Sequence, residues 1–345
     1  MQTKPSSYLP WAWAGLWLGV NLLQSAWSPV DADEAYYWLY ARQLAWGYYD
    51  HPPAVAALIA LGNSLSPTTA LGLRLGHVLA GTLAVGLLYD FVGPAPGLAR
   101  PGSLTVDFRP AVPTSLWLYC YARWPTAALY RAFLRQYRSF LAHPNTRNGL
   151  WLAPIMAALL YSKYHGLLLI LFSILPNLGF LLRQRAAWLA VGLGALLYMP
   201  HLYWQFAYDF PSFRYHLAGR NDPYELKFTT EFLLNQLLVF NPFFIYFYFV
   251  ALRHTQSDRF LQACRWLVFL TLAFFLYSTS RGGAEPQWTA TAAPPLLLLT
   301  FLWLDQASPR QYTLFRRLGL LSLLLFALAR LYLVAPRSWL PMPNL

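Results

Sequence analysis

The chain has 345 residues, of which 57% are hydrophobic, 18% are aromatic and only 11% are charged. Soluble domains usually carry about 25% charged residues, so this composition excludes an ordinary soluble enzyme. The formal net charge of +12 would suit a nucleic-acid partner, but the placement of the charges along the chain indicates a membrane instead.

Uncharged apolar stretches recur along the whole chain, and several approach the roughly 20 residues that a helix needs to cross a hydrocarbon core. They predict an all-α polytopic membrane protein with about nine transmembrane helices and interfacial helices in the first outer loop, all in one domain over residues 1–345. No small-residue cleavage pattern follows the first stretch, which therefore indicates a transmembrane helix and not a signal peptide. The expected spans are 11–29, 70–91, 150–162, 164–182, 187–206, 232–252, 266–280, 286–304 and 318–336.

The charged residues are divided between two alternating sets of loops. Segment 93–149 and the loops at 183–185 and 253–265 are basic, whereas loops 30–69 and 207–231 carry most of the acidic residues. By the positive-inside rule, the basic loops are cytoplasmic and the acidic loops face outward. This predicts a multi-pass protein of a bacterial plasma (inner) membrane, with a cytoplasmic N-terminus, a periplasmic active site and no nucleic-acid partner.

Segment 93–149 is the least membrane-like part of the chain. It is rich in Pro and Arg, and its strongly apolar stretch at 114–122 is too short to cross a bilayer. We predict an atypical basic cytoplasmic loop with a surface or re-entrant piece. Cys120 in this segment and the distant Cys264 are expected to be small apolar residues without disulfide or metal chemistry.

The first outer loop, residues 30–69, holds the leading candidates for chemistry. Asp31 is placed to cap a helix on the membrane surface, and Asp33 and Glu34 follow in its first turn. Two adjacent acids outside a span could provide a general base and its partner for glycosyl transfer. The alternative, which composition alone favours, is a charged helix end that only marks the membrane boundary.

A rigid turn, G-Y-Y-D-H-P-P at residues 47–53, follows this helix. His51, held by Pro52 and Pro53, could bind a phosphate or orient an acid. The alternative is a turn with incidental polar residues.

Further polar groups lie in turns beside apolar runs. In Y-S-K-Y-H-G, Lys163 and His165 lie where a charge is costly unless it is paired or reaches a water-filled cavity. Lys163 could hold a lipid-linked phosphate, or it could snorkel to the interface. The remaining candidates for binding the substrate or the carrier phosphate are in outward loops, where a solvated surface or an aromatic belt is the alternative: Arg214, Arg220, Arg281, Glu285 and Trp288.

No cluster in the sequence has the spacing of a metal site, so we expect no metal and no cofactor, although the sequence leaves a divalent cation open. P-loop, dinucleotide-binding and HExxH motifs are absent from the sequence, which removes the usual support for nucleotide-driven transport and zinc hydrolysis.

The motif D-A-D-E-A-Y-Y-W, followed at a fixed distance by G-Y-Y-D-H-P-P, resembles the GT-C membrane glycosyltransferases of families 39 and 83, which include protein O-mannosyltransferases and the aminoarabinose transferases of lipid A. The motifs Y-S-K-Y-H-G, F-P-S-F-R-Y-H and A-E-P-Q-W are also similar to bacterial members. The resemblance implies a polyprenyl-phosphate sugar donor, an outer-face active site and inversion at the anomeric carbon. It assigns Asp33 as the base with Glu34 as its neighbour, and it places His51, Pro52 and Pro53 near the carrier phosphate. Lys163 matches a lysine that the family carries between two short spans.

The chain also departs from this family. Known members are longer, and they carry a further acidic P-D-x-P motif where this chain has L-T-V-D-F-R-P-A-V-P-T. Asp107 is a poor match to that motif. We therefore keep the hypothesis that segment 93–149 is a deleted or frame-disrupted version of a membrane-spanning pair.

These observations predict a glycosyltransferase of the cell envelope that moves a sugar from a polyprenyl-phosphate carrier to a lipid, glycan or protein acceptor, in contact with membrane lipids. Lipopolysaccharide is one such acceptor. The competing predictions are a transporter or flippase of lipid-linked sugars and a catalytically impaired relative. A transporter would favour inverted repeats with broken helices, and the sequence shows no sign of either.

Overall fold

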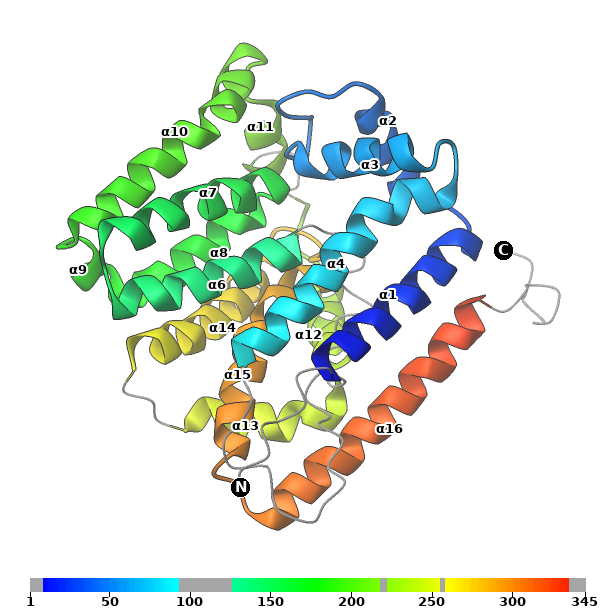
Figure 1. Cartoon of the computed structure of the whole chain (residues 1–345), viewed down its shortest axis with the longest axis vertical. Helices are drawn as coiled ribbons and strands as arrows, with labels where there is room; N and C mark the ends of the chain where they lie inside the picture. The colour runs from blue at the N-terminus through cyan, green and yellow to red at the C-terminus, as the bar shows by residue number, and fades with distance from the viewer. Residues whose placement is uncertain (1–8, 93–125, 218–221, 255–257, 335–345) are drawn as a thin grey trace.

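The computed structural model describes residues 9–92, 126–217, 222–254 and 258–334, and every regular element in these ranges is a helix (Figure 1). The prediction of an all-α chain is therefore confirmed for the described residues. In chain order the helices are α1 (Leu9–Trp27), α2 (Ala32–Arg42), α3 (Ala54–Leu65), α4 (Ala70–Val92), α6 (Thr126–Ala142), α7 (Thr146–Ser162), α8 (His165–Ile174), η1 (Leu175–Asn177), α9 (Leu178–Leu181), α10 (Arg185–Ala207), α11 (Pro211–Leu217), α12 (Leu226–Val239), η2 (Pro242–Phe244), α13 (Ile245–Arg253), α14 (Arg259–Ser278), η3 (Pro286–Ala292), α15 (Ala293–Leu304) and α16 (Pro309–Val334).

Two long helices and two short ones form the N-terminal part of the fold. The long helices α1 and α4 pack along each other, and the short helices α2 and α3 lie together at one end of them (Figure 1). Helix α3 approaches α4 closely, because a Cβ atom on Gly62 would come within 2.0 Å of the carbonyl oxygen of Gly72. The helix predicted after Asp31 is α2, and α3 is a second short helix in the same loop. Their position on a membrane surface stays a prediction.

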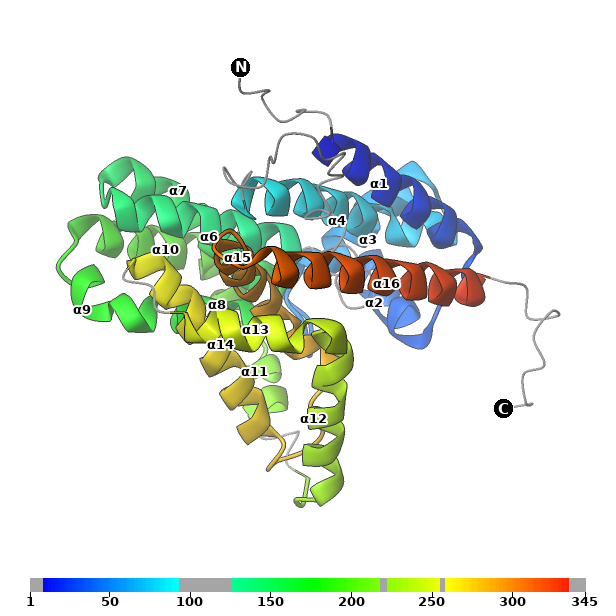
Figure 2. The ribbon, with the colours of Figure 1, turned by 90° about the horizontal axis from the view of Figure 1, so that it is seen from below.

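The main core is built from α6, α7, α8, α13, α14 and α15. Helix α15 is apolar all round, and its residues from Ala293 to Phe301 are all buried, as expected for a helix enclosed by its neighbours. Cys264 in α14 is a buried residue of this core, and Cys120 lies outside the described residues. Figure 2 shows α12 and the end of α14 extending to one side of the bundle.

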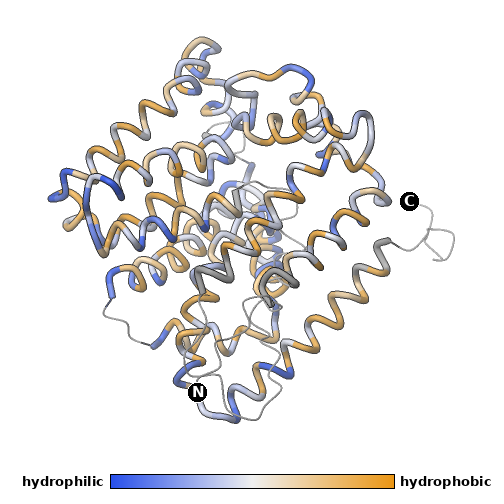
Figure 3. Tube along the Cα trace, viewed as in Figure 1, coloured by the Kyte–Doolittle hydropathy of each residue, from blue (hydrophilic) through white to orange (hydrophobic). Residues whose placement is uncertain are grey.

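Each predicted span contains helical structure. However, fewer than nine helices in the described part of the chain are long and apolar enough to cross a membrane. Four helices within the described ranges are long and apolar enough to cross a membrane, and a bent pair could make a fifth. Others are short: α7 has 17 residues, and the expected span 164–182 is divided into α8, η1 and α9. Apolar residues follow the helices, and hydrophilic residues gather at their ends (Figure 3). The predicted count of nine is therefore not confirmed.

The expected span 232–252 is a broken helix. Helices α12 and α13 are together long and apolar enough to cross a membrane, but the chain bends by 75° between them. The break falls at Asn241, whose φ is 62°, directly before Pro242. A proline cannot donate a backbone hydrogen bond, and it disfavours the α region for the residue before it, so the helix cannot continue through this pair. The sequence reading, which found no sign of broken helices, missed this interruption.

The described part of segment 93–149 differs from the predicted loop. Residues 126–142 form helix α6, which packs against α4 and α7 in the main core. Tyr130, Phe133 and Tyr137 are at most 1% exposed, and they recur at the three- and four-residue spacing of one helix face. This periodicity could have been read from the sequence, but the neighbouring prolines and arginines concealed it. Residues 93–125, including Asp107, lie outside the described residues, so the cytoplasmic side and the disrupted-segment hypothesis stay predictions.

Candidate functional site

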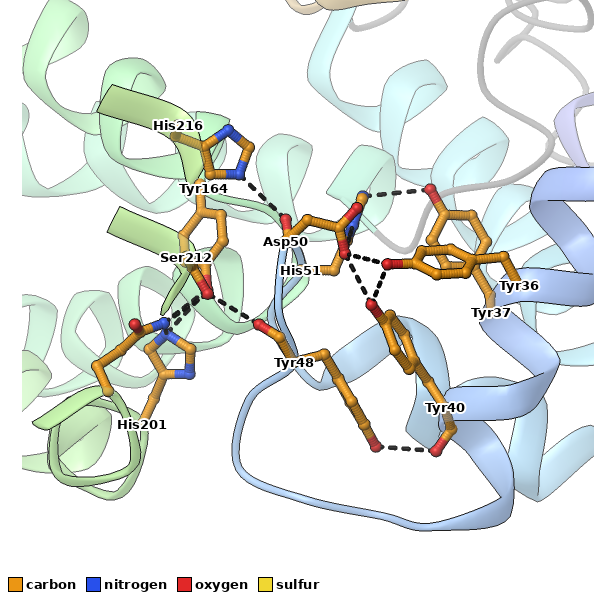
Figure 4. A network of polar contacts seen from close by, with 11 residues as sticks. Tyr36, Tyr37, Tyr40, Tyr48, Asp50, His51, Tyr164, His201, Ser212 and His216 are labelled. Atoms are coloured by element: carbon orange, nitrogen blue, oxygen red, sulfur yellow. Dashed lines mark hydrogen bonds and ion pairs between the residues drawn. The ribbon is translucent and has the colours of Figure 1, made fainter. Parts of the chain in front are cut away.

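The loop between α2 and α3, residues 43–53, places Asp50 at the centre of a polar network (Figure 4). The hydroxyl groups of Tyr36 and Tyr40 donate hydrogen bonds to Asp50 Oδ1 at 3.0 Å and 2.9 Å, and the two hydroxyls also contact each other. His51 Nδ1 lies 3.0 Å from the same oxygen. On its other side, His51 Nε2 is 3.2 Å from the hydroxyl of Tyr37. The aromatic residues of α2 therefore orient both the carboxylate and the imidazole of the turn.

The charge state of this network follows from its contacts. Burial alone would raise the pKa of Asp50, but the hydrogen bond and charge of His51 and the hydroxyls of Tyr40 and Tyr36 lower it overall. Burial, with the negative charges of Asp33 and Asp50, raises the pKa of Tyr37. Asp50 is therefore a carboxylate at neutral pH, and the tyrosine hydroxyls stay protonated and able to donate.

The two acids of the first turn of α2 have different surroundings. Asp33 is exposed, and its charge acts on Tyr37 one helical turn later. Glu34 is buried and forms an ion pair with Arg74 of α4, with Nη2 and Oε2 2.6 Å apart. Asp31 and Glu34 also form a capping box, which confirms the predicted cap. Asp33 is thus accessible to a substrate, whereas Glu34 is engaged in holding helices together.

Two predicted residues lie in the turn between α7 and α8. Lys163 is half-buried at the end of α7, and its carbonyl accepts a hydrogen bond from Gly166 at 2.8 Å. His165 begins α8, and its ring lies 5.2 Å from that of Trp288 and 5.4 Å from that of Phe275. The structure therefore brings His165 and Trp288 together, although they are far apart in sequence.

The turn at 163–165 also meets the loop of the first two helices. The ring of Tyr164 lies 5.2 Å from that of His216 in α11, and His216 Nε2 donates to the carbonyl oxygen of Asp50 at 3.0 Å (Figure 4). Pro52 is buried next to His51. Three segments that are distant in sequence, loop 43–53, turn 163–165 and helix α11, thus converge at one end of the bundle.

The remaining predicted residues lie on the outside of this region. Arg214 is exposed on α11 and forms an ion pair with Asp209 at 2.6 Å, and Arg220 lies outside the described residues. Arg281 is exposed and lies 5.7 Å from the ring of Tyr277. Glu285 is exposed directly before η3.

Sequence reasoning assigned no role to several residues that build the site. The sequence analysis placed Asp50 in the rigid turn 47–53 but predicted no contact between it and the tyrosines of the preceding helix. The spacing of Tyr36 and Tyr40, one helical turn apart, is the signal that could have paired them. His201 and Gln205 share the same spacing inside an otherwise uncharged span, and both are fully buried. Polar residues inside such a span indicate a functional or structural polar network.

Within the described ranges, no group of three or more His, Cys, Asp or Glu residues is arranged to hold a metal ion. The expectation of a site without metal or cofactor stays a prediction.

Comparisons with known proteins agree with this fold. Residues 50–204 match the family of dolichyl-phosphate-mannose-protein mannosyltransferases. Two crystal structures of ArnT from Cupriavidus metallidurans are similar: the complex with undecaprenyl phosphate, with a TM-score of 0.68 and 17% identity, and the apo state, with a TM-score of 0.65 and 16% identity. Both alignments cover 89% of this chain and 62% of the ArnT chain. No curated protein matches the sequence. The chain therefore has the GT-C fold of ArnT, as its sequence resemblance implied, over a little less than two thirds of the length of ArnT.

Proposed function

We propose that this protein is a membrane glycosyltransferase that takes a sugar from a polyprenyl-phosphate carrier. The convergence of loop 43–53, turn 163–165 and helix α11 carries the proposal, because it brings the segments of His51 and Lys163, two residues assigned to the carrier phosphate, to one end of the bundle. The ArnT structure that shares this fold was solved with undecaprenyl phosphate bound, which supports a carrier of the same chemical class. The proposed acceptor is a lipid, glycan or protein hydroxyl on the outer face of a bacterial plasma membrane.

The carrier phosphate would be bound by cationic and hydrogen-bonding groups from the three segments. Lys163 supplies a compact point charge, and Arg214 supplies a planar fork that suits phosphate oxygens. Asp50 holds the ring of His51 at Nδ1, and Nε2 can donate to a phosphate oxygen in place of its contact with the hydroxyl of Tyr37. Arg220, the second arginine of the same outward loop, is proposed as a further phosphate ligand.

In the proposed reaction, the acceptor oxygen attacks the anomeric carbon while the bond from that carbon to the carrier phosphate breaks. Asp33 takes the proton of the acceptor hydroxyl, and the electron pair of the broken bond leaves on the phosphate. A single displacement of this kind inverts the anomeric carbon. The exposure of Asp33 on α2 supports the role of base, and the buried ion pair of Glu34 supports a role in fixing that helix.

The sugar would lie towards η3. The adjacent rings of His165 and Trp288 offer an apolar surface for one face of a pyranose. Arg281 and Glu285 are exposed in the turn before η3, and we propose that they contact polar groups of the donor or acceptor.

A transporter of lipid-linked sugars is the second candidate, and one observation favours it. The helix pair α12 and α13 is broken at a 75° bend, and broken helices form substrate sites in many transporters. A transporter would not require an exposed acid such as Asp33 beside an ordered polar loop. Catalysis and transport therefore differ in their dependence on that carboxylate.

The test measures sugar release from a radiolabelled polyprenyl-phosphate sugar by the purified chain. Asp33→Asn is expected to lower turnover by about 10²- to 10⁴-fold, because the loss of a general base has effects of this size. Glu231→Gln is the control, since Glu231 is exposed on α12 and its contact with Lys227 is 3.7 Å long. Full activity in Asp33→Asn would refute the assignment of the base. Binding without turnover in the wild-type chain would favour the transporter or the catalytically impaired relative.

A further inference from the structure

Residues 46–50 of loop 43–53 are held in place through hydrogen bonds to their backbone carbonyl groups. Alternate carbonyl groups, those of Trp46, Tyr48 and Asp50, each accept a hydrogen bond from a side chain of α10 or α11. Figure 4 shows the contacts of Tyr48 and Asp50. The donors are His201 Nδ1 at 2.6 Å, Ser212 Oγ at 2.8 Å and His216 Nε2 at 3.0 Å respectively. We call these three residues the carbonyl clamp.

The carbonyl partners fix the proton positions of the clamp. A carbonyl oxygen only accepts, so His201 carries a proton on Nδ1 and His216 carries one on Nε2. With His201 neutral, its Nε2 is then an acceptor, and the hydroxyl of Tyr164 lies 3.3 Å from it. The clamp therefore has one arrangement of donors and acceptors.

The side chains of the carbonyl clamp are themselves held by a second set of hydrogen bonds, made by Gln205 and Tyr164. Gln205 Nε2 donates to Ser212 Oγ at 2.7 Å and to the hydroxyl of Tyr164 at 3.0 Å. His201 and Gln205 are 0% exposed, and Ser212 is 1% exposed. A buried network of this kind specifies one conformation, because each broken hydrogen bond leaves a polar group without water. Since Tyr164 follows Lys163 directly, the same network connects the loop to the turn at 163–165.

The turn between α10 and α11 is strained in a way that serves this arrangement. Asp209 and Phe210 have φ values of 62° and 54°, a region that residues other than glycine rarely occupy. The backbone N–H of Phe210 donates to the carbonyl of Gln205 at 2.6 Å, and this hydrogen bond closes the turn in which the chain reverses its direction. The reversal places Ser212 and His216 beside the end of α10, where His201 lies. Strain of this kind persists where the surrounding contacts over-determine the backbone.

We propose that His201, Ser212 and His216 are positioning residues. They hold loop 43–53 so that His51 and Lys163 stay in position to bind the same carrier phosphate. The inference rests on the proposed function for the identity of that ligand. The clamp binds backbone and not side chains, so its role is to set the place of the loop and not to take part in the chemistry. Loss of the carbonyl clamp therefore weakens binding of the carrier and leaves the rate of the proton-transfer step nearly unchanged.

The first measurement is hydrogen–deuterium exchange of peptides covering residues 44–53 in the purified full chain. His201→Leu, Ser212→Ala and His216→Ala are expected to speed exchange there about fivefold to tenfold, the change that the loss of one buried hydrogen bond produces. His201→Asn and His216→Gln retain a donor near the original nitrogen, and they are expected to restore protection. Ser173→Ala is the matched control, because Ser173 is 1% exposed and donates to a carbonyl within α8.

The second measurement is the Kd of the purified full chain for undecaprenyl phosphate. The kcat is measured alongside it, at a saturating concentration of the sugar donor. The clamp variants are expected to raise Kd about fivefold to tenfold and to leave kcat near the wild-type value. His216 is exposed, so His216→Ala keeps the test valid if a variant at one of the two buried positions unfolds the chain.

Unchanged loop exchange in all three variants would overturn the clamp. Faster exchange with an unchanged Kd would overturn its positioning role. A wild-type chain that does not bind undecaprenyl phosphate would refute the proposed function instead, and the exchange data alone would then decide whether the clamp holds the loop.

Discussion

Arg74→Gln tests how the first outer loop is held against the helices. The side chains of Arg74 and Glu34 are 13% and 9% exposed, and they form two hydrogen bonds of 2.7 Å and 2.6 Å. The same guanidinium donates to the carbonyl groups of Ser25, Ser28 and Pro29 at 2.9, 2.9 and 2.7 Å. Carbonyl groups at the end of a helix lack partners within it, so one side chain caps α1 and anchors α2 to α4.

The expected destabilisation follows from burial. Removing one partner of a buried ion pair costs about 3–5 kcal/mol, mostly because the remaining charge stays buried without compensation. Arg74→Lys keeps the charge but loses the planar fork, so we expect a smaller loss. The double variant Glu34→Gln with Arg74→Gln leaves no buried charge, and it is expected to cost less than the sum of the two single variants.

The assay is equilibrium unfolding of the purified chain in mixed detergent, followed by circular dichroism. Lys227→Gln is the control, because its contact with Glu231 is exposed and such pairs contribute about 0.3–0.5 kcal/mol. A loss below about 1 kcal/mol in Arg74→Gln, or full additivity in the double variant, would refute the role of this pair as an anchor.

Three further predictions concern the loop and the backbone. The lowered pKa of Asp50 means that its ionised form stabilises the fold fully above its ordinary value of 3.8, and that this contribution is lost as the pH falls through the lowered value. Wild type and Asp50→Asn should therefore differ in unfolding free energy at pH 6 and converge in strong acid; a constant difference would contradict the assignment. Gly62→Val should cost about 1–3 kcal/mol or more, because its side chain would meet the backbone of Gly72, whereas Gly86→Ala has open space and should be neutral or stabilising. Both Asn241→Gly and Asn241→Val lose the hydrogen bonds of the side chain with Ser322 and Phe243, but Asn241→Val should cost about 1–2 kcal/mol more, since a β-branched residue is disfavoured at a φ of 62°. Equal thermal stability of the two variants would show that the backbone there adapts.

Composition and periodicity determined the fold class. Long uncharged stretches require a nonpolar solvent and internally satisfied backbone groups, so an all-α membrane chain followed from the sequence. The cap at Asp31 also followed, because capping is a contact between residues three apart. The motif pair around Asp33 and His51 indicated the GT-C fold, which the structural similarity to ArnT supports.

The tertiary structure decided which polar residues meet. Asp33 and Glu34 are neighbours in sequence, but they point to different surroundings, and Arg74 is 40 residues away from the acid that it binds. His201 and Trp46 are separated by 155 residues, and no local pattern predicts their hydrogen bond. Ser212 reaches the same loop only because a strained turn at Asp209 and Phe210 reverses the chain after α10. Helix propensity and hydrophobic period report on residues within a few turns of each other. The spatial order of the site depends on how whole helices pack, and that information is spread over the entire chain.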